Sequence, residues 1–340
     1  MRHVISLADI YPDDLSRLVD DALKIAAGQD AADQPLKGKV GGIYFRGTST
    51  RTRTSFTVGA MKLGAQVIAY GPNDLQLVTG ESIQDTARVL SGFLDFLVIR
   101  TNGSIEEMRT LANQDRMSII NAMSENEHPT QAIADLDTSK EALGHLNNVH
   151  VLYLGEGNNS AAALALAVGM TEGMKLTLVT PEGYGLPHGV LEFADTLARR
   201  GGASIEQHHD IGSLPKNVDV VYTTRWQTMG VPKSDPDWQS KFKPYSVTQK
   251  MMTRVSKPAG TIFLHDLPAV RGAEVTEEVL DGPQSLAFRQ AYHKMTGAMA
   301  VLKWCANASA IPDLIAEAFP SPKYLTHSAI RDELTSTRFQ

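Results

Sequence analysis

A short run of hydroxyl and guanidinium side chains is the feature of this sequence that most directly indicates chemistry; it is Ser49-Thr50-Arg51-Thr52-Arg53. The run follows an apolar segment at residues 42–45 and precedes residues with the apolar spacing of a helix, so we expect it on a strand-to-helix turn. At such a turn, free backbone N–H groups and the positive end of the helix dipole favour an anion. Two guanidinium groups beside hydroxyl donors therefore predict a phosphate clamp. The alternative is a Ser/Thr helix cap followed by arginines in solvent.

Polar clusters also follow the other apolar runs that we interpret as strands. Because ligands bind beyond the carboxyl ends of the strands in an open parallel sheet, these clusters are predicted to share one rim. A lone histidine beside a helix start is more often structural, and a lone arginine is often a surface residue, but the shared placement favours a site. The clusters are Arg100-Thr101, His128-Pro129-Thr130-Gln131, Gly155-Glu156-Gly157-Asn158-Asn159, Thr224-Arg225-Trp226-Gln227-Thr228-Met229 and His265-Asp266-Leu267.

The elements that must position these clusters alternate between strand-like and helical patterns, which predicts parallel sheets wrapped by helices. Strands are expected at residues 42–45, 66–70, 96–99 and 118–120, then at 147–154, 176–179, 218–222 and 261–264. Helices are expected at residues 12–27, 83–90, 105–111 and 130–143. A chain of 340 residues is long for a single core, so we expect two domains with a boundary near 140–148. The Gly/Pro-rich residues 231–244 are predicted to form a loop, a candidate substrate lid.

Composition and charge exclude several classes of protein. Hydrophobic residues make up 42% of the chain and charged residues 21%, the usual composition of a globular protein in water. No apolar run approaches the roughly 20 residues that span a membrane, and the amino terminus lacks a signal-peptide pattern, so a cytoplasmic protein is expected. A net charge of −6 without a basic stripe argues against nucleic acid as a partner.

The cysteine content bears on metal sites and disulfides. Cys305 is the only cysteine, which excludes an intrachain disulfide and a cysteine-clustered metal site. Its apolar neighbours predict a buried thiol. We expect neither a metal nor a cofactor.

Four segments, in order and with suitable spacing, resemble the signatures of the aspartate/ornithine carbamoyltransferase family. They are STRTR at residues 49–53, ESIQDTARVL at 81–90, HPTQ at 128–131 and HDLPAVRGAEV at 265–275. The resemblance implies two doubly wound α/β domains, residues 1–140 for carbamoyl phosphate and 148–290 for the amino acceptor. It also implies a late helix, at about 290–318, that crosses back to the first domain, and a homotrimer with active sites at subunit interfaces. Residues 320–340 are expected to be a peripheral tail.

The resemblance also implies roles for the donor side of the site. Arg100, His128 and Thr52 would donate to the carbamoyl oxygen, and Gln131 would contact the carbamoyl amide. The leaving phosphate can accept the amine's proton, so no nucleophilic side chain is required. The residues expected to bind carbamoyl phosphate are Ser49, Thr50, Arg51, Thr52, Arg53, Arg100, His128, Gln131, Leu267 and Lys294. Lys294 stands where the ornithine branch usually has an arginine, and lysine lacks its planar fork.

The acceptor side departs from both branches of the family. Thr224 stands where the ornithine branch has an aspartate that helps to bind the α-ammonium group. The segment that it begins, Thr224-Arg225-Trp226-Gln227, resembles the Thr-Arg-x-Gln of the aspartate branch, whose arginine and glutamine hold the acceptor's side-chain carboxylate. The residues expected to bind the acceptor are Met123, Asn159, Thr224, Arg225, Gln227, Thr228, Met229 and Asp266.

Asp266 is a second departure, because the ornithine branch has cysteine there and the aspartate branch has proline. A carboxylate at this position can bind the acceptor's ammonium group or accept its proton. The residues expected to act in catalysis are therefore Arg100, His128, Gln131 and Asp266. The alternative is a loop carboxylate that caps Leu267 or pairs with Arg271.

These features predict a carbamoyltransferase whose acceptor is neither ornithine nor aspartate, such as a short diamino acid of specialised metabolism. The alternative within the same class is an ornithine carbamoyltransferase that makes citrulline. A non-catalytic binding protein with the same fold is a further alternative, since fold does not fix function. A dinucleotide site at residues 155–160 is not expected, because the next strand ends in Thr180-Pro181 without an acidic residue to hold a ribose.

Overall fold

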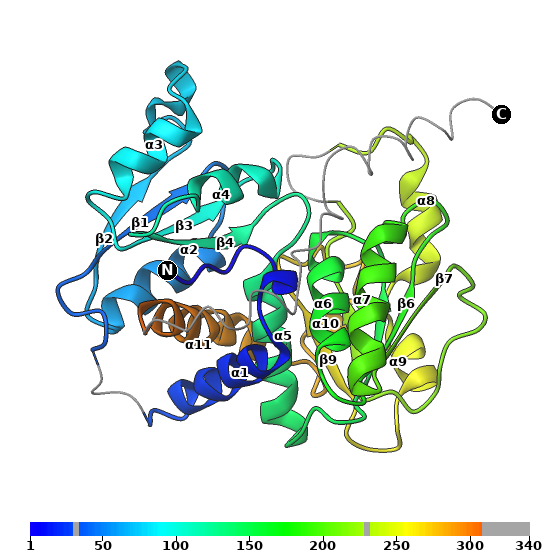
Figure 1. Ribbon diagram of the computed structural model, residues 1–340. Coiled ribbons are helices and arrows are strands. Elements are labelled where there is room, and N and C mark those ends of the chain that lie inside the picture. The colour runs from blue at the N-terminus through cyan, green and yellow to red at the C-terminus, as the bar shows by residue number, and fades with distance from the viewer. Residues whose placement is uncertain (30–33, 228–231, 308–340) are drawn as a thin grey trace.

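The protein, described from a computed structural model, places two parallel β-sheets next to each other, each flanked by helices (Figure 1). The structure describes residues 1–29, 34–227 and 232–307. The predicted α/β fold of two parallel sheets is confirmed. None of the helices in this described part combines the length and apolar character needed to span a membrane.

The first sheet has the strand order β2-β1-β3-β4. The chain adds β2 on one side of β1 and then crosses over to add β3 and β4 on the other side. Its strands were expected from apolar runs, since parallel strands covered on both faces are apolar throughout. The polar residues after β1 and β3 consequently lie at a topological switch point, where ligands bind in such sheets. The strands are β1 (Val40–Phe45), β2 (Gln66–Tyr70), β3 (Phe96–Arg100) and β4 (Ser118–Met123).

The second sheet has the order β7-β6-β5-β8-β9, with its own switch point between β5 and β8. The sequence did not predict β7, because Ile205 is its only apolar residue and an edge strand needs no continuous apolar run. The strands are β5 (His150–Leu154), β6 (Lys175–Val179), β7 (Ser204–His208), β8 (Val220–Thr223) and β9 (Ile262–His265).

Helices cover both faces of the first sheet. In Figure 1, α3 and α4 lie on one side of it and α2 and α11 on the other. Local sequence explains several starts: proline occupies the first turn of α1 and α5, and the Ser82 hydroxyl accepts a hydrogen bond from the Asp85 N–H at the start of α3. The bounds are η1 (Leu7–Asp9), α1 (Pro12–Ala26), α2 (Arg51–Lys62), η2 (Gln76–Thr79), α3 (Ile83–Leu90), α4 (Ile105–Leu111) and α5 (Pro129–Leu143).

The remaining helices follow β5. The segment predicted to be a loop at 231–244 contains, in its described part, the short helix α8 and the start of the turn η3. Trp238 and Phe242, at the two ends of α8, pack edge to face with ring centroids 5.6 Å apart. The bounds are α6 (Asn159–Gly169), α7 (His188–Gly201), α8 (Trp238–Phe242), η3 (Lys243–Tyr245), α9 (Gln249–Val255), α10 (Glu277–Leu280) and α11 (Ala287–Ala306).

Helix α11 returns from the second sheet and packs on α1, α2 and α5 of the first domain, as predicted for the late helix. A glycine permits one of these crossings: a Cβ at Gly59 of α2 would lie 2.9 Å from the Met299 Cγ of α11. Cys305, near the end of α11, is buried, and burial raises the pKa of its thiol to about 12. The predicted extension of this helix to about 318 and the tail at 320–340 lie outside the described residues. The predicted boundary near 140–148 covers the last residues of α5 and most of the connection to β5, and it stays a prediction.

Candidate active site

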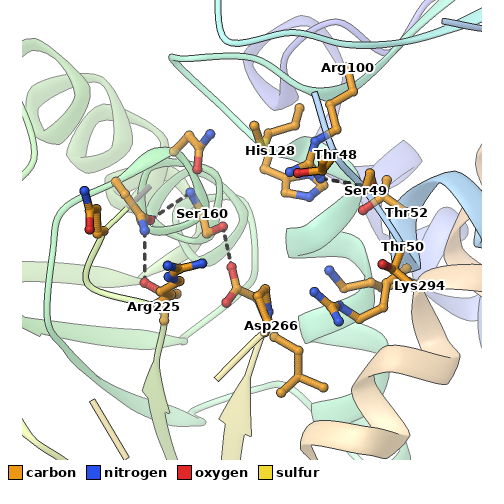
Figure 2. Close-up of a pocket in the computed structure, with 18 residues that line it drawn as sticks. Thr48, Ser49, Thr50, Thr52, Arg100, His128, Ser160, Arg225, Asp266 and Lys294 are labelled. Carbon is orange, nitrogen blue, oxygen red and sulfur yellow. Dashed lines mark hydrogen bonds between the residues drawn. The ribbon is translucent and has the colours of Figure 1, made fainter. Parts of the chain in front are cut away.

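One pocket collects side chains from the carboxyl ends of both sheets (Figure 2). The first domain contributes residues that follow β1, β3 and β4, and the second contributes residues that follow β5, β8 and β9; Lys294 enters from α11. The lining residues are Thr48, Ser49, Thr50, Arg51, Thr52, Arg100, Met123, His128, Asn158, Asn159, Ser160, Thr224, Arg225, Gln227, Asp266, Leu267, Pro268 and Lys294. The structure therefore brings most of the predicted site residues together.

The predicted phosphate clamp is divided by the start of helix α2. Thr50 is the residue before the helix and Arg51 is its first residue. The Ser49 hydroxyl accepts hydrogen bonds from the Arg100 guanidinium, at 3.4 Å, and from the Arg53 backbone N–H, at 3.3 Å. The Arg53 guanidinium instead donates to the Tyr70 carbonyl and lies outside the pocket, because residues two apart on a helix point to different sides.

Three cationic side chains face the first-domain half of the pocket. Burial is the largest effect on each of them and lowers the pKa of Arg51, the pKa of Arg100 to about 10 and the pKa of Lys294 to about 8. The negative charge of Asp266 partly opposes this lowering in all three. Burial and the charges of Lys294 and Arg100 lower the pKa of His128 well below its ordinary value, so its imidazole is neutral. A small dianion would offset the mutual repulsion of these cations, and the neutral His128 would still offer one N–H.

The opposite half of the pocket is built around the N-terminus of α6. The Thr224 hydroxyl accepts a hydrogen bond from the Asn158 amide at 2.9 Å and lies 3.0 Å from the Tyr153 hydroxyl. Because the Tyr153 hydroxyl donates to the Glu156 carbonyl at 2.6 Å, Thr224 must be the donor to Tyr153. The proton of Thr224 is thus already used within the wall. The Asn159 amide, likewise, donates to the Ser124 carbonyl at 2.7 Å and joins the two halves.

The other predicted acceptor residues differ in their surroundings. Arg225 is half-buried and has no ion-pair partner in the described part of the chain, and Gln227 lines the pocket beside it. Met123 is 7% exposed and lines the wall. Thr228 and Met229 lie outside the described residues, so their predicted contact with an acceptor stays a prediction.

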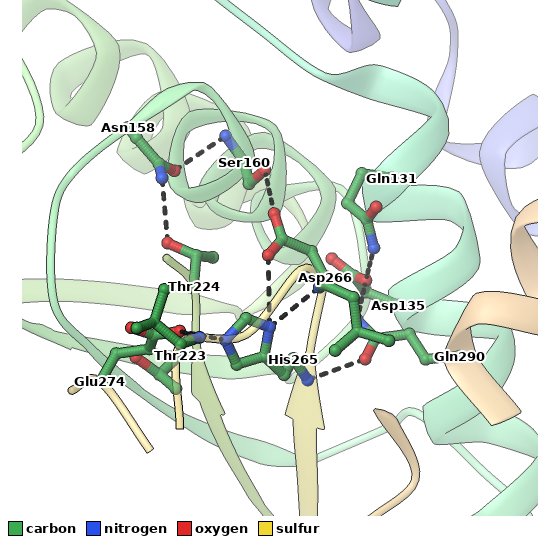
Figure 3. Close-up of polar contacts among 12 residues, drawn as sticks. Gln131, Asp135, Asn158, Ser160, Thr223, Thr224, His265, Asp266, Glu274 and Gln290 are labelled. Atoms are coloured by element: carbon green, nitrogen blue, oxygen red, sulfur yellow. Dashed lines mark hydrogen bonds and ion pairs between the residues drawn. The ribbon is translucent and has the colours of Figure 1, made fainter. Parts of the chain in front are cut away.

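Asp266 lies between the two halves, with its side chain 16% exposed (Figures 2 and 3). Its carboxylate accepts a hydrogen bond from the Ser160 hydroxyl at 2.9 Å. Asp266 neither caps Leu267 nor pairs with Arg271, the two alternative roles considered from the sequence. The Leu267 N–H donates instead to the His265 Nδ1 at 2.8 Å, and Arg271 pairs with Asp281 at 2.9 Å. Since Nδ1 of His265 accepts, its proton is on Nε2, which lies 3.3 Å from the Glu274 carboxylate. Asp266 is therefore held facing the pocket rather than used in its own loop.

Gln131 differs most from its predicted place. It is fully buried, does not line the pocket, and donates its amide to Asp135 at 2.7 Å, while its carbonyl oxygen has no partner among the described residues. Thr48, Asn158, Ser160 and Pro268 line the pocket although the sequence assigned them no role in binding or catalysis; Asn158 was named only as a member of a rim cluster. Asn158 had a signal, since Asn before a helix start is a common cap, whereas the Ser160 bond to Asp266 spans 106 residues and has none.

No group of three or more histidine, cysteine or acidic side chains in the described part of the chain could hold a metal ion. Among the described residues that line it, the pocket offers a cluster of cations, a neutral histidine and one carboxylate, Asp266, between its two halves. Such a set can bind a small dianion on one side and an amine on the other.

Comparisons with known proteins agree with this geometry. The family described as aspartate/ornithine carbamoyltransferase, carbamoyl-P binding domain, matches residues 2–141, and the corresponding Asp/Orn binding domain matches residues 147–305. The chain is 40% identical over 304 residues to an ornithine carbamoyltransferase of Caldicellulosiruptor saccharolyticus, covering 89% of this chain and 97% of that protein. It is 39% identical over 303 residues to one of Oceanobacillus iheyensis, covering 88% and 93%.

Solved structures show the same likeness. The ornithine carbamoyltransferase from Pyrococcus furiosus superposes with a TM-score of 0.82 at 34% identity, covering 88% of this chain and 96% of that one. The anabolic enzyme of the same name from Campylobacter jejuni gives a TM-score of 0.83 at 30% identity, covering 91% and 100%.

Proposed function

This chain belongs to the aspartate/ornithine carbamoyltransferase family and is a carbamoyltransferase, and we propose that its pocket transfers the carbamoyl group of carbamoyl phosphate to an amine of an amino acid, with ornithine as the first acceptor. The observation that carries the proposal is the cluster of Arg51, Arg100 and Lys294 beside the neutral His128, with the carboxylate of Asp266 between this cluster and the acceptor half. Ornithine is named first because the relatives compared above are ornithine carbamoyltransferases.

The reaction assigns a task to each half of the pocket. Ser49, Thr50, Arg51 and Thr52 hold the phosphate, and Lys294 adds positive charge to it. Arg100 and the N–H of His128 donate to the carbamoyl oxygen as it becomes negative in the tetrahedral intermediate. The amine attacks the carbonyl carbon, the bond from that carbon to the phosphate oxygen breaks, and phosphate leaves. The amine's proton goes to the departing phosphate or to Asp266.

A second acceptor class is favoured by one observation. The hydroxyl of Thr224 is already bonded to Asn158 and Tyr153, while Arg225 lacks an ion-pair partner among the described residues and the carboxylate of the pocket is at Asp266. This arrangement supports a shorter diamino acid, whose amine binds near Asp266 and whose carboxylate binds Arg225. It is the acceptor predicted from the sequence, and the relatives support ornithine better.

We also propose that the chain acts as a homotrimer in the cytoplasm, with active sites at subunit interfaces. The support is the family resemblance together with exposed apolar side chains around strand β2 and helix α3, among them Ile68, Val89 and Phe93.

The test is release of phosphate from carbamoyl phosphate with a panel of amines that includes ornithine, aspartate, putrescine, 2,3-diaminopropionate and 2,4-diaminobutyrate. Turnover of ornithine alone would exclude the second acceptor class, and turnover of the short diamino acids alone would exclude ornithine. No amine-dependent phosphate release would contradict the proposed function.

Arg51→Ala is expected to lower the rate on the order of 10²- to 10³-fold, the usual cost of losing one donor to the reacting group. Arg53→Ala is the matched comparison, because it removes the same charge from the same helix outside the pocket. Its loss should be much smaller, and equal losses would contradict the assignment of the phosphate site to Arg51.

A further inference from the structure

A buried chain of hydrogen bonds runs behind the pocket and joins three separate elements (Figure 3). The Oδ1 atom of Asp135, on α5, accepts one hydrogen bond from the Gln131 amide at 2.7 Å and one from the Gln290 amide at 2.6 Å. The Gln290 carbonyl oxygen, on α11, accepts the backbone N–H of His265 at 2.9 Å, at the end of β9. All four residues are at most 1% exposed, so solvent cannot substitute for a lost partner.

Each of the three elements contributes a pocket residue close to its point of attachment. His128 stands three residues before Gln131 at the start of α5, and Lys294 stands one helical turn after Gln290 on α11. Asp266 is the residue after His265. Asp135 Oδ1 therefore links α5 to α11 directly, and the Gln290 carbonyl oxygen continues the link to the end of β9; these three backbones carry the imidazole, the ammonium group and the carboxylate of the pocket.

The two well-formed hydrogen bonds of this junction are both to Oδ1, because Oδ2 of Asp135 has no partner of normal hydrogen-bond geometry among the described residues. Burial, with a smaller contribution from Asp266, raises the pKa of Asp135 to about 7, although both amide donors and the nearby Tyr222 hydroxyl oppose the rise. A proton on this group would sit on Oδ2, and the two bonds to Oδ1 would remain. An asparagine in its place likewise keeps an acceptor at Oδ1, whereas alanine removes the junction.

We propose that Asp135 is a positioning residue for carbamoyl transfer, which holds α5, α11 and the end of β9 together so that His128, Lys294 and Asp266 keep their relative positions. The proposal rests on the proposed function of the pocket. Asp135 itself does not line the pocket, so its effect is exerted through the elements that it joins.

The first measurement is steady-state kinetics of the full chain as Asp135→Ala, Asp135→Asn and Gln290→Met. Met keeps the length of the glutamine side chain but cannot bridge Asp135 and His265. A misplacement of about 1 Å at reacting groups costs on the order of 10²-fold in rate, so we expect that loss in kcat for Asp135→Ala and Gln290→Met, with a smaller change in KM for carbamoyl phosphate. Asp135→Asn should restore kcat to within a few-fold of the unsubstituted protein.

The second measurement does not depend on activity. Hydrogen–deuterium exchange of the peptide that spans residues 262–268 should become faster in Asp135→Ala and Gln290→Met, because the His265 N–H loses its anchored acceptor, and should stay unchanged in Asp135→Asn. If Asp135→Ala fails to fold, Gln290→Met decides both measurements.

The outcomes separate this proposal from the proposed function. A folded Asp135→Ala with kcat within twofold and unchanged exchange would overturn the positioning role, and so would an Asp135→Asn as impaired as the alanine variant. An inactive unsubstituted protein would count against carbamoyl transfer, while the exchange of residues 262–268 would still support or overturn the junction.

Discussion

At the scale of single residues, Thr224 and Asp266 are the positions where the sequence was expected to depart from the pattern of the ornithine branch. The Thr224 hydroxyl is neutral and is already hydrogen-bonded to Asn158 and Tyr153, so it cannot balance the charge of an ammonium group. Asp266 can, because its only hydrogen bond in the described part of the chain comes from the neutral Ser160 hydroxyl. The negative charge of the pocket is therefore at the end of β9, where it interacts with Arg51, Arg100 and Lys294.

Glu127 allows a test of stability against pH at the same scale. Its carboxyl group is buried and accepts hydrogen bonds from the Leu7 N–H, at 2.8 Å, and from the Ser6 hydroxyl. Burial raises its pKa from 4.5 to about 7, although these two donors oppose the rise. Because the folded state binds this proton more tightly than the unfolded state, the contribution of Glu127 to stability is largest below pH 4.5. It falls as the pH rises towards 7 and stays low above it.

Glu127→Gln removes this titration. The free energy of unfolding of the variant, relative to the unsubstituted protein, is expected to rise by about 3 kcal/mol between pH 4.5 and pH 8. Urea unfolding at the two pH values measures it. The exposed Glu172→Gln is the control and should leave the difference constant. Parallel pH profiles for Glu127→Gln and the unsubstituted protein would show that the pKa of this carboxyl group is not raised by folding.

At the scale of elements, the loop that joins β5 to α6 depends on a close backbone approach. A Cβ at Gly157 would lie 2.3 Å from the Leu186 nitrogen and 2.4 Å from the Gly185 carbonyl carbon. These are backbone atoms, so the clash cannot be relieved by rotating a side chain. The loop ends at Asn158 and leads to Asn159 and Ser160 at the start of α6, and Ser160 contacts Asp266.

Gly157→Ala should therefore destabilise the fold by about 1–3 kcal/mol, the usual cost of overpacking, and raise KM for the acceptor more than KM for carbamoyl phosphate. Thermal unfolding and initial rates measure the two effects. Gly189→Ala is the matched control, since no atom lies within 4 Å of its Cβ position in α7 and the helix should gain up to about 1 kcal/mol. Similar effects of the two substitutions would contradict the close approach at Gly157.

At the scale of the whole molecule, the edge strand β2 and its neighbours expose apolar side chains that a second copy would cover. Phe93 is 73% exposed, Val78 55% and Val89 51%, and all three belong to η2, to α3 or to the turn that follows α3. Sedimentation equilibrium is expected to give three times the mass of the chain. Phe93→Glu should shift the mass toward a single chain, because a charge would then be buried in the interface. A single-chain mass for the unsubstituted protein would contradict the proposed trimer.

The sequence by itself determined the α/β class, most strands and the edge at which most of the predicted site residues meet. Buried parallel strands are continuous apolar runs, and their carboxyl ends meet at one edge, so the order of residues along the chain is enough to place Ser49, Arg100, His128 and Asp266 together. Helices α3 and α4 agree with the predicted ranges because their caps and apolar spacing are local signals.

Only the tertiary structure decided which of these residues face the pocket. Arg51 and Arg53 look equivalent in the sequence, yet the start of α2 at Arg51 points them to different sides. Gln131 stands behind the wall with Asp135, and Ser160 meets Asp266 across 106 residues. Such contacts depend on how elements far apart in the chain pack against each other, and the spacing of residues along the chain contains no periodic signal for them.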